Sequence, residues 1–115
     1  MNRGDIVLVK FPFTDLSSSK VRPALVVSVD TYNQASKDSI FIFISSNISS
    51  QENTDVLVEK SHSEFKMTGL IGASIIKVDK IAVLEKSLAS RKLGKAGPQL
   101  LKAVESRLKN ILDLN

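Results

Sequence analysis

The chain has 115 residues and a mass of 12.6 kDa, which suits one compact domain and is too small for two separate hydrophobic cores. It contains no cysteine, so disulfide bonds, thiolate catalysis and the common structural zinc sites are excluded. The formal charge of +4 is uneven, since residues 30–66 hold three basic and six acidic side chains and residues 77–109 hold nine and three. This predicts a surface that attracts nucleic acid or an acidic protein, or a lysine-rich face that only aids solubility.

The first ninety residues predict short strands separated by turn-forming clusters, which is typical of a small antiparallel barrel or sandwich. Strands are expected at residues 6–9, 24–29, 39–44 and 55–59, with a polar loop at residues 14–20 after the first. Residues 73–78 and 81–84 predict two more short strands or one bent strand. Residues 30–33 suit a helical turn, and residues 61–68 are expected to be a connection closed by Gly69.

The periodicity changes near the C-terminal end of the chain. Gly97 and Pro98 are typical of a helix start, because proline at the first helical position needs no N–H. An apolar stripe then predicts an amphipathic helix across the barrel; it consists of Leu101, Val104, Leu108 and Ile111 or Leu112. We therefore expect one mainly β domain at residues 1–115, with a barrel at about 3–90 and a C-terminal helix at about 98–113.

Several chemistries are excluded by the motifs that the sequence lacks. It has no apolar run long enough to span a membrane and no signal-peptide pattern, so a cytoplasmic protein is expected. It has no glycine-rich phosphate loop and no hydrolase or zinc-protease motif. His62, the one histidine, lies in a polar connection, and the carboxylates are scattered, so we expect neither two-histidine catalysis nor a bound metal.

Four positions are candidates for chemistry, each with a simpler alternative. Arg22 lies at a loop-to-strand junction before Pro23, where its guanidinium could bind phosphate or could be an ordinary surface arginine. Ser45, at the end of a buried strand, could contact a ligand or only close the strand. Lys77 and Asp79, two residues apart, are expected on one side of a strand, which could simply be its solvated face.

Two spaced motifs, RGDIVLV at residues 3–9 and VRPALVVS at residues 21–28, give the chain a specific family resemblance. Together they closely resemble the opening of the PemK/MazF toxins. The resemblance continues more loosely through Tyr32 and Asn33, the strand into Ser45, the segment at residues 68–70 and the strand that holds Lys77. It implies an SH3-like barrel with a C-terminal helix, a homodimer, cleavage of single-stranded RNA at short sequences and a cognate antitoxin.

The resemblance also implies a mechanism without cofactor or metal, in which the 2′-hydroxyl of the RNA attacks the adjacent phosphate. The family's catalytic arginine and hydroxyl residue map onto Arg22 and Ser45, which would stabilise the phosphorane charge and orient the phosphate. The arginine and aspartate of the PemK branch map onto Lys77 and Asp79, and Asp79 would accept the proton. RNA-binding candidates beside these positions are Lys77, Lys20, Ser46 and Lys80.

Three departures from the family pattern and two alternative functions remain. The loop after the first strand lacks the glycine, glutamate and glutamine pattern and the histidine of some members, while Ser45 replaces a threonine and Lys77 an arginine. The related CcdB family uses a similar barrel to poison DNA gyrase without catalysis, and fold alone does not separate these functions. A non-catalytic RNA-binding barrel is the second alternative.

Overall fold

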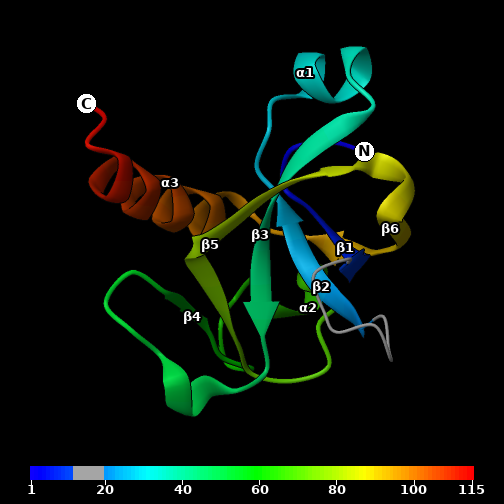
Figure 1. Cartoon of the computed structure of the whole chain (residues 1–115). Coiled ribbons are helices and arrows are strands. Elements are labelled where there is room, and N and C mark those ends of the chain that lie inside the picture. Colours follow the sequence, from blue (N-terminus) through cyan, green and yellow to red (C-terminus); the bar gives the residue numbers. More distant parts are fainter. Residues whose placement is uncertain (12–19) are drawn as a thin grey trace.

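The computed structural model describes residues 1–11 and 20–115, so most of the loop expected at residues 14–20 lies outside the described residues. Six strands form one sheet: β1 (Asp5–Phe11), β2 (Lys20–Val26), β3 (Asp38–Ser45), β4 (Val56–Val58), β5 (Ser74–Glu85) and β6 (Ala89–Lys95). Its order is β4-β5-β3-β2-β1-β6 and every neighbouring pair is antiparallel. The strands curl into a half-barrel, with β4 and β6 as edges (Figure 1), which confirms the predicted fold class.

Three α-helices and two short 3-10 helices complete the described part of the chain: α1 (Asp30–Ala35), α2 (Phe65–Thr68) and α3 (Pro98–Leu112), with η1 (Ile48–Ser50) and η2 (Lys86–Leu88). The helical turn expected at residues 30–33 is present as α1. The segment expected to be only a connection contains α2, and Gly69 closes this helix in the left-handed conformation at φ +73°. The expectation for this segment was therefore incomplete, because a single helical turn is too short to show an apolar period.

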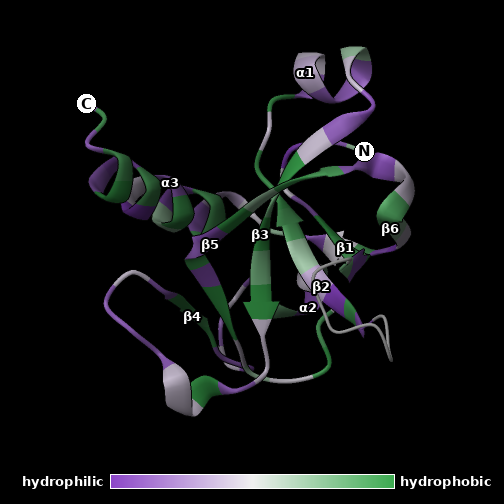
Figure 2. Ribbon diagram, viewed as in Figure 1, coloured by the Kyte–Doolittle hydropathy of each residue, from purple (hydrophilic) through white to green (hydrophobic). Residues whose placement is uncertain are grey.

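Both faces of the sheet are apolar, because the strands carry hydrophobic residues at successive positions (Figure 2). One face packs against α3 and forms the helix-side core, which includes Ile6, Leu25, Ile42, Ile76, Leu100 and Val104. The other face forms the opposite core, which includes Val7, Val9, Phe11, Ala24, Val26, Phe41 and Leu84. The alternation of side chains along each strand therefore decides which residues reach which core.

Helix α3 confirms the predicted C-terminal helix but not every residue of its predicted stripe. Leu100 and Val104 are its buried residues, whereas Ile111 and Leu112 are 37% and 52% exposed, so the stripe was wrong at its end. The helix begins at Pro98, and the backbone N–H groups of Gln99 and Leu100 donate to the Glu64 carboxylate at 2.8 and 2.9 Å. This buried carboxylate satisfies two N–H groups that a helix start leaves without partners.

Strand β5 is one strand with a bend, which is the second of the two alternatives that the sequence predicts. Its pairing with β3 jumps from Ile42 opposite Ile81 to Phe43 opposite Lys77, so residues 78–80 form a bulge without partners in β3. A bulge bends a strand and redirects the side chains around it. The bulge separates Lys77, which lies opposite Phe43, from Ile81, which lies opposite Ile42, and Asp79 is part of it.

Strand β6 is a strand that the sequence analysis missed. It is polar, with Ser90, Arg91 and Lys92 exposed, and it pairs with β1 at the edge of the sheet. The sheet therefore ends at Lys95, whereas the barrel was expected to end near residue 90. Edge strands commonly carry charges that prevent further pairing, so they lack the apolar alternation that predicts a strand. Strand β2 also differs, since it spans residues 20–26 where 24–29 was expected.

Candidate functional site

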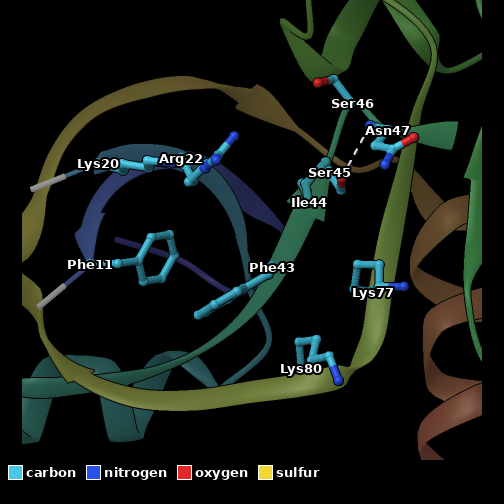
Figure 3. A pocket seen from close by; sticks show the side chains of 10 residues that line it. All are labelled: Phe11, Lys20, Arg22, Phe43, Ile44, Ser45, Ser46, Asn47, Lys77 and Lys80. Atoms are coloured by element: carbon cyan, nitrogen blue, oxygen red, sulfur yellow. Dashed lines mark hydrogen bonds between the residues drawn. The ribbon is translucent and has the colours of Figure 1, made fainter. Parts of the chain in front are cut away.

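A cavity of about 630 Å³ opens where β1, β2, β3 and β5 meet. The described residues that line it are Phe11, Lys20, Arg22, Phe43, Ile44, Ser45, Ser46, Asn47, Lys77 and Lys80. Figure 3 shows Lys20 and Arg22 on one side, Lys77 and Lys80 on the other, and the two phenylalanine rings between them. Four cationic side chains thus surround the rings of Phe11 and Phe43, and no described residue of the lining is a carboxylate.

Arg22 and Ser45 are brought together by the pairing of β2 with β3. Ala24 lies opposite Phe43 in this antiparallel pair. Arg22 lies two residues before Ala24 and Ser45 two residues after Phe43, and alternate residues of a strand share a face, so both are expected on the face that Ala24 and Phe43 share; both line the cavity. Residues that are far apart in sequence therefore meet at the cavity through one register.

The Arg22 and Ser45 side chains are both available to a ligand. Arg22 is exposed, and no carboxylate in residues 1–11 and 20–115 forms an ion pair with it. The Ser45 hydroxyl oxygen accepts the backbone N–H of Asn47 at 3.1 Å (Figure 3), which leaves its hydrogen for donation to a ligand oxygen. A guanidinium and a hydroxyl donor thus reach the cavity from neighbouring strands.

Lys77 lines the cavity but is held by a buried carboxylate. Its Nζ donates to Asp55 Oδ2 at 3.1 Å, and the exposed fractions of the two side chains are 14% and 0%. The same Asp55 oxygen accepts the backbone N–H of Glu52 at 2.9 Å. The hydrogen bond to Asp55 raises the pKa of Lys77 above its usual 10.5, against the opposing effect of burial. Lys77 is therefore a cation paired within the protein.

Lys80 and Asp79 form a different kind of pair. Their nearest charged atoms are 3.6 Å apart and the side chains are 58% and 33% exposed, so solvent weakens the attraction. Lys80 lines the cavity, whereas Asp79, in the bulge of β5, is not among its described lining residues. Six of the seven site residues predicted from sequence line the cavity, and Asp79 is the exception.

The sequence analysis missed five residues of this region: Phe11, Phe43, Ile44, Asn47 and Asp55. The two phenylalanines belong to apolar strands, where an aromatic residue predicts core packing, so no sequence signal marked them as part of a site. Asp55 immediately precedes β4 and reaches Lys77 because β4 pairs with β5. Asn47 could have been suspected because it closes the polar end of β3.

A second cavity of about 410 Å³ adjoins the first and shares Arg22, Ile44 and Ser46 with it. Its other lining residues include Leu70, the fully exposed Ile71 and Arg91. Such a wholly exposed isoleucine beside an apolar cavity is typical of a surface that another molecule covers. The two cavities form one continuous surface around Arg22.

The described residues contain no group of three or more side chains suited to hold a metal ion. Within the same part of the chain, no helix has the length and hydropathy that crossing a bilayer requires.

His62, which the sequence analysis left out of the site, is not among the described lining residues of the cavity, and its Nδ1 accepts the backbone N–H of Glu64 at 2.9 Å.

A family model for the PemK-like, MazF-like toxins of type II toxin–antitoxin systems matches residues 2–112. The chain belongs to this family. The match confirms the resemblance that the RGDIVLV and VRPALVVS motifs predict, and it extends the PemK/MazF assignment through β6 and α3. No curated protein matches the sequence significantly.

Solved structures agree with the PemK/MazF fold over nearly the whole chain. A MazF crystal structure from Deinococcus radiodurans is 21% identical, with 99% of this chain and 97% of that chain covered and a TM-score of 0.78. An endoribonuclease in complex with its cognate antitoxin from a mycobacterial species is 22% identical, with 100% and 97% covered and a TM-score of 0.75. The Mycobacterium tuberculosis toxin MazF-mt6 is 17% identical, with 96% and 98% covered and a TM-score of 0.75.

Proposed function

We propose that this PemK/MazF-family chain is a cytoplasmic toxin endoribonuclease that cleaves single-stranded RNA at short sequences and is neutralised by a cognate antitoxin. The observation that carries the proposal is the joint placement of Arg22, Ser45 and three lysines around one cavity. Phosphodiesters are anions, and such a cavity attracts them and supplies the donors that their oxygens require. Family membership and similarity to toxins solved with antitoxins support the antitoxin part.

In the proposed reaction the RNA supplies its own nucleophile. The 2′-oxygen loses its proton and forms a bond to the adjacent phosphorus, the bond from phosphorus to the 5′-oxygen breaks, and that oxygen takes a proton from water, which gives a 2′,3′-cyclic phosphate and a 5′-hydroxyl end. Arg22 stabilises the additional negative charge of the phosphorane, since a guanidinium carries only hydrogen-bond donors and has no acceptor for a proton. Ser45 donates its hydroxyl hydrogen to a phosphate oxygen. The reaction needs no metal, because no separate hydroxide has to be generated.

Asp79 stays the predicted acceptor of the 2′-hydroxyl proton. It neighbours the cavity through Lys80, to which it is paired at 3.6 Å. A general base typically contributes about 10²- to 10⁴-fold to the rate, so replacement by asparagine measures this role directly. Cleavage by Asp79→Asn at the wild-type rate would assign the proton acceptor to another group, without affecting the roles of Arg22 and Ser45.

Lys20, Ser46 and Lys80 are proposed to bind the RNA directly. Lys77 is proposed to stay paired with Asp55 and not to bind phosphate directly. A buried ion pair has little net charge to offer a phosphate, whereas the exposed Lys80 can leave Asp79 at small cost. Replacing Lys80 with glutamine is therefore expected to reduce the salt dependence of RNA binding. For single strands, the slope of log K against log salt concentration should fall by about 0.7.

The matched control replaces both members of the buried pair, with Asp55→Asn and Lys77→Gln in one protein, so that the local charge is unchanged. Its slope is expected to equal that of the wild type when binding of an uncleavable 2′-O-methyl oligonucleotide is titrated at several salt concentrations. A decrease as large as that of Lys80→Gln would mean that Lys77 leaves Asp55 and binds phosphate directly.

A homodimer, implied by the family, is proposed to cover the second cavity and to bring two sites to one RNA. The exposed Ile71 beside Arg22 supports this arrangement. Sedimentation of the purified chain at twice its 12.6-kDa mass is expected, and a monomer at micromolar concentration would contradict it.

The nuclease proposal is separated from its two alternatives by one incubation of purified protein with mixed single-stranded RNA in EDTA. Cleavage products with 5′-hydroxyl ends are expected, and the cognate antitoxin should suppress them. RNA binding without products over many sequences would favour the non-catalytic RNA-binding barrel. Neither binding nor cleavage, together with inhibition of DNA gyrase, would favour a protein-directed toxin of the CcdB kind.

A further inference from the structure

Phe43 differs from the other phenylalanine of its strand. Phe41 is fully buried in the opposite core, whereas Phe43, two residues later on the same face, is only half-buried and lines the cavity. Its ring centroid lies 4.0 Å from that of Phe11, with the ring planes at 48°. Phe11 is itself buried and supports Phe43 from β1 (Figure 3). An aromatic ring with a fixed orientation is therefore presented to the cavity.

The groups around this ring are cationic. Lys20, Arg22, Lys77 and Lys80 line the same cavity, and β3 carries Ser45 only two residues beyond Phe43. Proteins that bind single-stranded nucleic acid combine these two elements, with cations that follow the backbone and aromatic rings on which bases stack. An apolar peptide side chain would pack on the phenylalanine rings but would leave Lys20 and Arg22, which form no ion pair with a described residue, without anionic partners.

We infer that Phe43, supported by Phe11, is a stacking platform for one nucleobase of the RNA, the base next to the phosphate held by Arg22 and Ser45. This inference rests on the proposed function and adds a specificity element to it. The platform selects a single strand, because a base within a duplex is stacked on its neighbours and its face is not accessible. Stacking tolerates any base, so sequence preference comes from other contacts.

A tryptophan introduced in place of Phe43 reports the stacking directly, because the chain contains no tryptophan. Bases that stack on an indole quench its fluorescence. Binding of an uncleavable, single-stranded 2′-O-methyl oligonucleotide is expected to quench the Phe43→Trp variant. The matched control is Tyr32→Trp on α1, a residue that is 37% exposed and is not among the described lining residues, and its fluorescence should not change.

A second variant removes the aromatic face but keeps an apolar side chain. Phe43→Leu is expected to bind the same oligonucleotide about five- to 150-fold more weakly, as is typical when a base loses an aromatic partner. An oligonucleotide with one abasic position should bind the wild type more weakly by a similar factor. It should bind Phe43→Leu no more weakly than the intact oligonucleotide does, because the contact is already absent.

The outcomes separate the platform from the proposed function. Quenching and the abasic result without any RNA cleavage would support the platform and overturn the nuclease. Cleavage by the wild type, with unchanged fluorescence of Phe43→Trp and unchanged affinity of Phe43→Leu, would overturn the platform and leave the nuclease intact. Quenching of the Phe43→Trp variant by the cognate antitoxin but by no oligonucleotide would assign the cavity to a peptide and would also overturn the platform.

Discussion

Replacing Arg22 with alanine is expected to lower the rate of RNA cleavage at least about a hundredfold, as loss of one donor to a transition-state charge typically does. The guanidinium reaches the cavity from β2, and no carboxylate of the described residues competes with the phosphorane for its positive charge. The measurement is the single-turnover cleavage rate of a short oligoribonucleotide with enzyme in excess.

Two further variants separate charge from geometry in this prediction. Arg22→Lys keeps the charge but loses the planar fork that binds two phosphate oxygens, so an intermediate rate is expected. Lys102→Ala removes one positive charge from an exposed position of α3 and should cleave at the wild-type rate. If Arg22→Ala cleaves as fast as Lys102→Ala, the proposed transition-state role of Arg22 is wrong.

Replacing Gly94 with alanine is expected to destabilise the fold by about 3 kcal/mol, the upper end of the usual cost of overpacking. An added Cβ would lie 2.2 Å from the backbone oxygen of Met67 and 2.5 Å from the carbonyl carbon of Thr68. These are backbone atoms of α2, so no side chain can rotate to relieve the contact. Strand β6 and helix α2 would have to separate, which would expose Leu93 and the adjoining wall of the second cavity.

The measurement for this second prediction is the urea midpoint of unfolding, compared with that of Gly72→Ala. At Gly72 an added Cβ meets only Lys60 Cε at 3.8 Å, an ordinary contact, so a change within about 0.5 kcal/mol is expected. Equal midpoints for the two alanine variants would show that the close approach of α2 to β6 is not required for stability.

Much of the site could be predicted from local sequence. Ser45 follows the most apolar run of the chain and was recognisable as a strand end, whereas the junction predicted at Arg22 was wrong, because Arg22 lies within β2 opposite Val9. The family motifs then gave them roles. Phe43 was not recognisable, because its sequence context is the same as that of the buried Phe41 and only curvature of the sheet leaves its ring at the cavity.

The pair of Lys77 and Asp79 shows where sequence periodicity stops being sufficient. A regular strand places residues i and i+2 on one side, which was the basis of the prediction. The pairing of β4 with β5 supplies Asp55 as the partner of Lys77, whereas Asp79, in the bulge at residues 78–80, pairs with Lys80. Neither event has a local signal, since both depend on which strands become neighbours.

The sequence by itself determined the family, the mainly β fold with a C-terminal helix, and Arg22 as the leading residue for phosphate chemistry, because these follow from motifs and hydrophobic periods that lie within short segments. Tertiary structure alone decided which residues share the cavity with Arg22. The pairing of β2 with β3 brings Ser45 to the same cavity, Asp79 lies in the bulge of β5 outside the described lining of that cavity, and a buried carboxylate pairs with Lys77. These are contacts between distant segments, and their geometry exists only once the sheet has formed.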